Sequence, residues 1–304
     1  MLLILINVIF NSFLVGVFFQ LAHSVILFFL QLAKVTNAFS KPFHPDFYYF
    51  CAFCVVSTFV VIGYSPIGGF LATLFSNAKR AKGTDLEYFS ANLEKVLVPY
   101  NRSTGENLTS RDFNLLIQSE QTVNAMAIGK KTIVATSGFL QKEPELIQCV
   151  LAHELGHLHY GDSMVTIAII AGCYPIRICY WINYIFMNMA RFAAMIISWI
   201  PVIGLISNLF VLLMQLLCLP LIAINWLGNK IFDFMFLMNS RRAEYRADQF
   251  ASDLNYGDSM IYFLEWIDSI PGMEKGNAFT QMFSSHPLTR KRIARLQKIK
   301  ENGI

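Results

Sequence analysis

The chain has 304 residues, of which 55% are apolar and 14% are charged, and its formal net charge is +4. The mean hydropathy of +0.48 is typical of a membrane protein and excludes a chain made only of soluble globular domains. The few charged residues are unevenly spread, so the stretches that lack them indicate how the chain is organised.

Two long stretches near the start of the chain contain no Asp, Glu, Lys or Arg. They cover residues 1–33 and 47–78, and each exceeds the roughly 20 residues that a helix needs to cross a bilayer. The first stretch has no basic start and no small-residue cleavage site, so it differs from a signal peptide and is expected to be retained as an anchor. The sequence therefore predicts two membrane spans before residue 80.

A pair of short strands is predicted next. Residues 124–128 and 132–136 have a strand-like composition, and they flank the turn Gly129–Lys131. A strand just ahead of a catalytic helix could bind an extended peptide by backbone pairing along its free edge. An ordinary hairpin without a substrate role is the alternative.

Residues 153–157, with the sequence HELGH, match the H-E-x-x-H signature, in which one helix presents two zinc ligands and a general base. On a helix the two histidines lie about 40° apart around the axis, so both imidazoles can reach one metal ion while Glu154 flanks it. Residues 142–145 are typical of a helix start, and residues 161–162 are typical of its end. The alternative is an amphipathic helix whose histidines only cap or pack.

A catalytic zinc site normally has a third protein ligand and leaves its fourth position for water. The motif does not continue to a glycine and a third histidine, because Tyr160 and Ser163 occupy those positions. His159 lies about 200° around the helix from His157 and is expected to be solvated or packed. The third ligand must therefore come from elsewhere in the chain.

A second helical stretch, residues 240–248, supplies a suitable carboxylate. Glu244 and Asp248 lie one turn apart on one face of this helix. The pair suits Glu244 as a zinc ligand and Asp248 as an acid that hydrogen-bonds the free ring nitrogen of a zinc-binding histidine. Taken alone, the stretch is typical of a solvated charged helix; beside H-E-x-x-H, it indicates the second half of a metal site.

The stretch between the two halves of the metal site, residues 163–229, carries only two formal charges, Arg177 and Arg191. The ligands must meet on one side of the membrane, so the chain must cross it an even number of times between them. The length of the stretch fits two crossings but not four. The sequence therefore predicts a membrane hairpin.

The turn of this hairpin is expected near residues 188–191, with Pro201 and Pro220 kinking or bounding the second leg. The stretch is longer than two spans and a turn need. An interfacial helix around residues 192–199 would take up the excess.

Basic residues give the expected orientation of the spans. They are more frequent on the side of the metal site, as the following two groups show: Lys79, Arg80, Lys82, Lys230, Arg241 and Arg242 on that side, and Lys34, Lys41 and Arg191 on the other. The positive-inside rule then places the site in the cytoplasm. The six cysteines agree, because they suggest no disulfide framework. Two glycosylation sequons, at Asn101 and Asn107, would reverse the orientation if they were used.

Together these features predict a mainly α-helical membrane protein. Four transmembrane helices are joined to an α+β zincin-like metalloprotease domain with a small antiparallel sheet, which the membrane hairpin splits in two. The expected boundaries are residues 1–76 for the first two spans, 77–162 for the first part of the protease domain, 163–229 for the hairpin and 230–304 for the second part.

This order of features resembles that of the HtpX-like membrane zinc metalloproteases, relatives of the CAAX prenyl endoproteases. The resemblance covers nearly the whole chain: two spans, an edge strand, the H-E-x-x-H helix, two more spans, the stretch 240–248 and finally Ser285–Pro287. The prenyl endoproteases have more spans than 304 residues can supply, so their choice of substrate is not carried over.

The resemblance implies one zinc ion held by His153, His157 and Glu244, with Glu154 as the general base for peptide hydrolysis. It also matches His286 to a position proposed to steady the oxyanion. From the sequence alone, His286 would be a loop histidine before a proline.

For the substrate, the resemblance implies backbone pairing along Asn124, Ala125, Met126 and Ala127. It implies a multi-pass protease of the bacterial inner membrane, facing the cytoplasm, which degrades damaged or misfolded membrane proteins in the stress response. The source of the chain does not follow from the sequence, and in a eukaryotic membrane with used sequons the orientation would reverse.

The basic run from Arg290 to Lys300 is expected to form an amphipathic closing helix rather than a nucleic-acid site. The expected partners are therefore the lipid bilayer and protein substrates, with the oligomeric state unknown. Two alternatives stay open. In one, a closed four-ligand zinc site only staples the two soluble pieces of a catalytically silent membrane scaffold. In the other, which has weaker support, Arg177 lines a transport pathway.

Overall fold

The computed structural model describes residues 1–32, 43–269 and 289–301. The chain folds as two compact units. The first consists of Met1–Val61 with Ile169–Asp233, and the second of Ile62–Ala168 with Phe234–Ile304. Both units therefore draw on two separated parts of the chain.

Four helices of the described chain are long and apolar enough to cross a membrane, as the sequence predicts. They are α1 (Leu2–Leu32), α2 (Pro45–Gly63), α7 (Asp162–Ile197) and α8 (Pro201–Ala251). Their side chains carry many exposed large hydrophobic groups, which an aqueous surface would not tolerate at this density. The prediction of four spans is confirmed.

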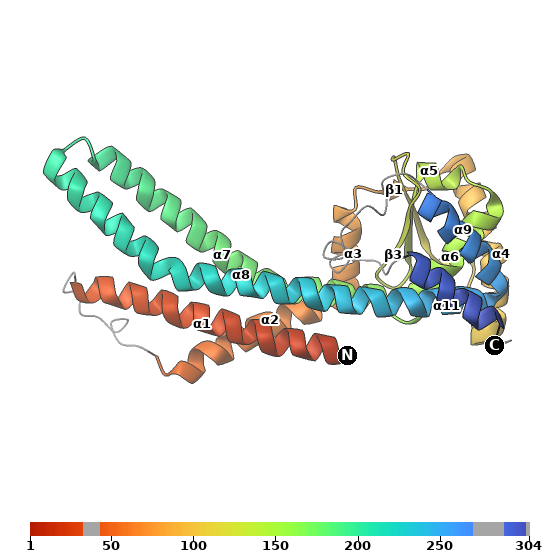
Figure 1. The fold of residues 1–304 in the computed structure, drawn as a ribbon, viewed down its shortest axis with the longest axis horizontal. Coiled ribbons are helices and arrows are strands. Elements are labelled where there is room, and N and C mark those ends of the chain that lie inside the picture. Colours follow the sequence, from red (N-terminus) through yellow and green to blue (C-terminus); the bar gives the residue numbers. More distant parts are fainter. Residues whose placement is uncertain (33–42, 270–288, 302–304) are drawn as a thin grey trace. The chain divides into compact units, whose positions relative to one another are not determined.

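Helices α7 and α8 form the predicted hairpin, but its turn lies further along the chain than expected (Figure 1). Helix α7 continues to Ile197 and α8 begins at Pro201, so the turn predicted at residues 188–191 is wrong, as is the separate interfacial helix at 192–199. Residues 188–191 contain no helix breaker. Proline instead disfavours helical geometry in the residue before it and suits the first position of the next helix.

A buried asparagine, Asn7, ties the first span to the third within the first unit. The side-chain amide of Asn7 donates to the carbonyl of Ile169 at 3.3 Å and approaches the sulfur of Cys173 at 3.4 Å. A Cβ at Gly172 would lie 2.0 Å from the Asn7 side-chain oxygen, so a larger residue there would displace the Asn7 side chain. Polar groups buried among apolar helices favour one defined packing, because they must find partners.

The apolar run 47–78 holds one span and one shorter helix rather than a single long span. Helix α2 ends at Gly63, and α3 covers Pro66–Phe75. Ser65 caps α3, because its hydroxyl accepts a hydrogen bond from the Ile67 backbone N–H at 3.2 Å. Proline at the first helical position fixes where α3 begins.

The second unit contains a four-stranded sheet with the order β1-β2-β4-β3. Its strands are β1 (Lys79–Arg80), β2 (Asn114–Gln118), β3 (Ala125–Ile128) and β4 (Thr132–Thr136). The hairpin of β3 and β4 is confirmed, but the antiparallel sheet is wrong, because β2 pairs with β4 in parallel. After β2 the chain first forms β3 at the edge of the sheet and then returns as β4 between β2 and β3.

Both faces of the sheet are covered. On one face, Leu115, Ile133 and Ala135 belong to the main core, together with α4 (Gly83–Thr104) and α6 (Pro144–His159). A separate cluster on the other face consists of Leu116, Ile128 and Val134, against which residues of α3 and the start of α7 pack. Figure 1 shows α3 on the side of the sheet opposite α4, α6 and α9 (Gly257–Ser269).

Helix α6 carries the H-E-x-x-H residues and is almost wholly buried along its middle. It begins and ends where the sequence predicts, with Pro144 in its first turn and Gly161, at φ 68°, beyond its last. At Gly156, α6 approaches the end of α8 so closely that an added Cβ would lie 3.0 Å from the Cα of Ala247 and 3.2 Å from the Cβ of Phe250. The glycine inside the motif thus lets the two halves of the predicted site come together.

Candidate metal centre

The two histidines of α6 point toward one another's ring nitrogens. The Nε2 atoms of His153 and His157 lie 3.2 Å apart, and only 6% of His153 is exposed. Their Nδ1 atoms face away from this gap toward carboxylates, so both Nε2 atoms are left for a common partner. This is the arrangement that spacing by four residues on a helix predicts.

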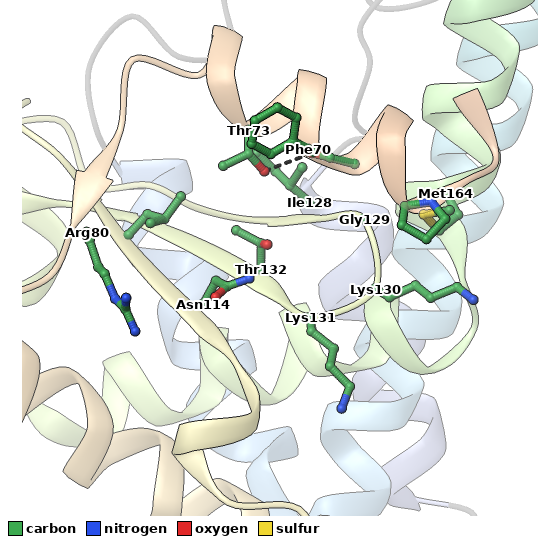
Figure 2. Close-up of a pocket in the computed structure, with 13 residues that line it drawn as sticks. Phe70, Thr73, Arg80, Asn114, Ile128, Gly129, Lys130, Lys131, Thr132 and Met164 are labelled. Carbon is green, nitrogen blue, oxygen red and sulfur yellow. Dashed lines mark hydrogen bonds between the residues drawn. The ribbon is translucent and has the colours of Figure 1, made fainter. Parts of the chain in front are cut away.

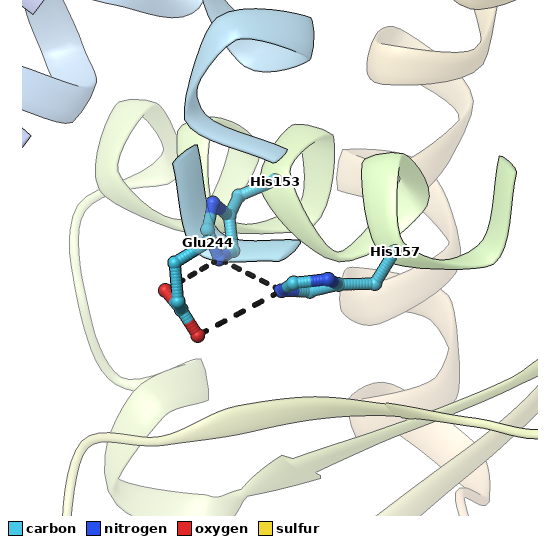
Figure 3. Close-up of side chains that lie close together, drawn as sticks. All are labelled: His153, His157 and Glu244. Atoms are coloured by element: carbon cyan, nitrogen blue, oxygen red, sulfur yellow. Dashed lines mark hydrogen bonds and ion pairs between the residues drawn. The ribbon is translucent and has the colours of Figure 1, made fainter. Parts of the chain in front are cut away.

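Glu244 of α8 completes the group from a distant part of the chain (Figure 3). Its Oε2 atom lies 3.5 Å from His153 Nε2, and its Oε1 atom lies 3.9 Å from His157 Nε2. One ligand atom from each residue lies within 4.8 Å of the others. Among the described residues, this is the one group of three metal-ligating side chains at such distances. Two imidazoles and one carboxylate are a donor set that suits zinc and leaves a fourth position open.

Asp248 lies beside the outer nitrogen of His153. Its Oδ1 atom is 3.0 Å from His153 Nδ1, and only 2% of the residue is exposed. A carboxylate at this place fixes the tautomer and ring orientation of a histidine ligand. The structure thus brings Asp248 to the atom that the spacing from Glu244 predicts.

Arg292 joins the site from the last described helix, α11 (Thr289–Glu301). Its guanidinium binds both carboxylate oxygens of Asp248, at 2.6 and 2.7 Å, and also contacts Glu244 Oε2 at 2.9 Å. The helix itself is confirmed, but the sequence analysis assigned no role to this arginine within the basic run. No local feature of the sequence around Asp248 or Arg292 indicates that the two residues pair.

Asp162 supports the second histidine and was read from the sequence only as a helix boundary. Its Oδ2 atom lies 3.3 Å from His157 Nδ1, and Arg246 pairs with its other oxygen. The turn at Gly161 brings Asp162 back beside the helix that it follows. An acid five residues after the second histidine was the available signal. Each histidine therefore has its own carboxylate, and each carboxylate has its own arginine.

Glu154 lies between the metal-ligand group and the edge of the sheet. Its Oε2 atom accepts a hydrogen bond from the Ala127 backbone N–H at 2.7 Å, and 7% of the residue is exposed. Burial raises the pKa of Glu154, and the positive charges of His157 and His153 act in the opposite direction. A carboxyl group with a raised pKa is suited to take up and return protons near neutral pH.

Burial by itself lowers the pKa of His153, but the hydrogen bonds and charges of Asp248 and Glu244 outweigh it and raise the pKa to about 10. A histidine binds metal only in its neutral form. A metal ion entering the site would therefore displace a proton, and its affinity should fall as the pH falls.

Strand β3 forms a free edge of the sheet beside Glu154. The Thr136 N–H donates to the carbonyl of Asn124, whereas the Ala127 N–H points away from β4 to Glu154. Backbone groups alternate in direction along a strand. Met126 therefore faces β4, and the backbone groups of Ala125 and Ala127 face the free edge.

The sequence analysis also singled out His159 and His286. His159 turns away from the ligand group, and its ring stacks on Phe250 with centroids 5.0 Å apart. His286 lies outside the described residues, so its role with the oxyanion stays a prediction.

Comparison with known proteins places the chain in a family. The model of peptidase family M48 matches residues 90–300, which include the H-E-x-x-H helix, Glu244 and Arg292. The chain belongs to peptidase family M48. It is a metalloprotease, and its four apolar helices indicate a multi-pass integral membrane protein.

Several relatives are proteases of the HtpX type. The chain is 29% identical over 270 residues to Protease HtpX homolog of Bacillus licheniformis, covering 78% of this chain and 82% of that protein. It is 26% identical over 269 residues to Protease HtpX of a Psychrobacter species, covering 77% and 81%. The HtpX-like resemblance is therefore confirmed.

The chain is also similar, over a smaller part of its length, to a protein named as a prenyl protease. The chain is 31% identical over 157 residues to Probable CAAX prenyl protease 1 of Schizosaccharomyces pombe, covering 50% of this chain but only 30% of that protein. The crystal structure of Ste24p from S. mikatae matches with a TM-score of 0.45 and 18% identity, covering 90% of this chain and 62% of that chain.

Replacing Asp248 by asparagine should weaken metal binding without removing a ligand. The variant keeps the size of the side chain but loses the charge that holds His153 and pairs with Arg292, so we expect a roughly 10 to 100-fold loss of zinc affinity. The measurement is competition with a chelator of known affinity, using detergent-purified protein.

Asp258→Asn is the matched control, because Asp258 is an exposed acid whose ion pair among the described residues is with Lys300, at 2.8 Å. Its zinc affinity should equal that of the unmodified protein. An Asp248→Asn variant with unchanged affinity would show that this carboxylate does not support the ligand set.

Proposed function

We propose that this protein is a zinc-dependent endopeptidase of the membrane, which hydrolyses peptide bonds in damaged or misfolded membrane proteins. The observation that carries the proposal is the meeting of three elements in one buried place: the His153–His157 pair, Glu244 from a separate helix, and Glu154 beside the free edge of β3. Family membership supports the reaction class. The substrate class rests on the edge strand and on the attachment of the unit to membrane spans.

His153, His157 and Glu244 would hold one zinc ion, with Asp248 and Asp162 orienting the two histidines. When bound, zinc supplies a Lewis acid that polarises the scissile carbonyl and lowers the pKa of a coordinated water to about 7. The three side chains leave one position free for that chemistry.

Glu154 is proposed as the general base. Its carboxylate takes a proton from the attacking water and returns it to the leaving amine. The hydrogen bond from the Ala127 N–H holds the carboxylate at the edge of β3, which is where a peptide paired with that edge would lie. His286 is proposed to stabilise the oxyanion, in line with the resemblance.

The N–H and carbonyl of Ala125 and the carbonyl of Ala127 would pair with the substrate as one more strand, while the Ala127 N–H holds Glu154. Pairing of this kind reads the backbone and makes few demands on side chains. It requires an extended segment, which unfolded proteins offer and folded ones do not. Such selectivity suits the removal of damaged or misfolded membrane proteins and a role in the stress response.

The protease unit is proposed to face the cytoplasm of a bacterial inner membrane. The excess of basic residues beside it, such as Lys79, Arg80 and Lys82, supports this orientation. The Asn101 sequon lends the reverse orientation little support. Its amide nitrogen, where a glycan would attach, donates to the carbonyl of Leu108 at 2.7 Å.

A catalytically silent scaffold is the alternative, with zinc only joining two pieces of the chain. A structural zinc site of this kind normally has four protein ligands. The described residues contribute three. In a scaffold Glu154 would also have no function, although it is buried and lies at the free edge of β3.

Replacing Glu154 by glutamine should abolish peptide cleavage while zinc stays bound. Glutamine keeps the shape of the side chain but cannot accept the proton of the attacking water. We expect at least about a hundredfold loss of turnover, in the range that general bases contribute. Cleavage of casein is measured beside the zinc content of the same preparation.

Glu145→Gln is the matched control, because Glu145 is an exposed acid in the first turn of the same helix. It should keep full activity. Cleavage by zinc-loaded Glu154→Gln at the normal rate would refute the assignment of the base.

Replacing Ala125 by proline should impair substrate binding and leave the sheet intact. Proline removes an N–H that faces the free edge, and edge positions of this kind tolerate proline. One lost backbone hydrogen bond is worth about 0.5–1.5 kcal/mol, so we expect KM for an unfolded substrate to rise roughly 2 to 12-fold. Steady-state kinetics with a peptide substrate gives KM and kcat separately.

Met126→Pro is the contrasting variant, because its N–H faces β4. It should lower the thermal stability of the protein, whereas Ala125→Pro should not. An Ala125→Pro variant with normal stability and unchanged KM would exclude pairing along this edge.

A further inference from the structure

A cavity of the protease unit lies between α3 and the sheet, away from the candidate metal ligands (Figure 2). Its volume is about 300 Å³. One wall is apolar and includes Phe70, Ile128 and Met164. Figure 2 shows α3 along one side and three basic side chains extending from the other: Arg80, Lys130 and Lys131. Neither the family reaction nor the proposed mechanism uses this pocket.

The lining of the pocket carries an excess of positive charge. No aspartate or glutamate is among the described residues that line it. Arg80, Lys130 and Lys131 are all exposed, and none forms an ion pair with a described residue. The carboxylate of Asp112 interacts with the charge of Lys131 from outside the lining, but it forms no ion pair with it. The lining therefore keeps an excess of positive charge, which attracts an anionic group.

The walls of the pocket continue directly into membrane spans. Helix α3 begins three residues after the end of α2, and Met164 lies in the first turn of α7. Phe70 and Phe75 of α3 are 67% and 79% exposed. Large exposed aromatic side chains on a short helix next to a span are typical of a segment that lies in the membrane interface.

The turn that carries the two lysines is fixed to these membrane-proximal helices. The Gly129 N–H donates to the Ser163 hydroxyl at 2.8 Å. An added Cβ on Gly129 would lie 3.3 Å from the Cα of Gly69, and Gly129 has a φ of 66°. Only glycine suits this place, since it combines a left-handed conformation with a close backbone contact. The lysines are therefore held beside the interface rather than on a free loop.

We propose that this pocket binds the phosphate-bearing headgroup of an anionic membrane phospholipid. The three cations would contact the headgroup, and the apolar wall would contact the upper part of the lipid. A free phosphate ion would use only the cations. An acidic peptide would contact the cations but would leave the apolar wall without a partner. Basic pockets beside the ends of spans are known to suit anionic lipids.

Binding at this pocket would also affect β3, whose free edge is the proposed substrate site, because the turn of Lys130 and Lys131 connects β3 with β4. A lipid held there would secure one end of the edge strand at the membrane surface. The binding itself does not depend on the proposed peptidase mechanism, so each can fail without the other.

The test uses the full-length protein in a nonionic detergent and follows its thermal unfolding. Short-chain phosphatidylglycerol, short-chain phosphatidylcholine and inorganic phosphate are titrated separately, below the micelle concentration of each lipid. A ligand that binds the folded state raises the midpoint in a saturable manner. We expect a saturable rise with phosphatidylglycerol and none with the other two.

Lys130→Gln/Lys131→Gln tests the pocket, and its apparent dissociation constant for phosphatidylglycerol should rise at least about tenfold. Lys95→Gln/Lys298→Gln removes the same charge from exposed positions elsewhere in the unit and should behave as the unmodified protein. Equal midpoints of the three proteins without lipid would show that folding is unaffected.

Several outcomes would overturn the proposal. They are an equal response to phosphatidylcholine, an equal response to phosphate alone, an undiminished response of the pocket variant, and an equal loss in the control variant. A saturable rise with an acidic peptide but none with phosphatidylglycerol would assign the pocket to protein rather than lipid and would equally overturn it.

Discussion

The bidentate pairing of Arg292 with Asp248, extended to Glu244, is the interaction on which the candidate metal centre depends. Four acids of the site and His153 are buried, and burying charge without a partner is very costly. Arg292 compensates two of the acids at once, at 2.6 to 2.9 Å. Removing one partner of such a buried pair typically costs about 3–5 kcal/mol. The last helix is thus part of the site and does more than close the fold.

The same logic is repeated on the other histidine, where Asp162 is paired with Arg246. Each histidine is held by an acid, and each acid by an arginine, so both rings are oriented from behind. Glycine at position 156 allows α6 and α8 to approach closely enough for this to happen. Because the ligands come from either side of a membrane hairpin, the site exists only when the unit has gathered both parts of the chain.

What the sequence could predict was local or compositional. The spacing of His153 and His157 defines their geometry on any helix, and the one-turn spacing of Glu244 and Asp248 places them on one face. Long uncharged runs revealed the four spans. What it missed depends on contacts between distant segments. Arg292 stands 44 residues from Asp248 in a run that looks like a solvated face, and only the folded chain pairs them.

The errors have equally specific causes. Strand β2 was not foreseen, since its pairing with β4 is parallel and leaves no turn signal, and the sheet was therefore taken as antiparallel. The sequence analysis places the hairpin turn at residues 188–191, which include the polar Asn188 and Arg191, but Pro201 decides where the second leg begins. Polar residues alone do not end a helix that lies among apolar neighbours.

The central claim is that two histidines and one glutamate, brought together from two helices, form an open zinc site. X-ray absorption at the zinc edge of the zinc-loaded, full-length protein tests it most directly. The account predicts two imidazole ligands, oxygen donors in the remaining positions and no sulfur. A third imidazole or a thiolate in the coordination sphere would contradict it.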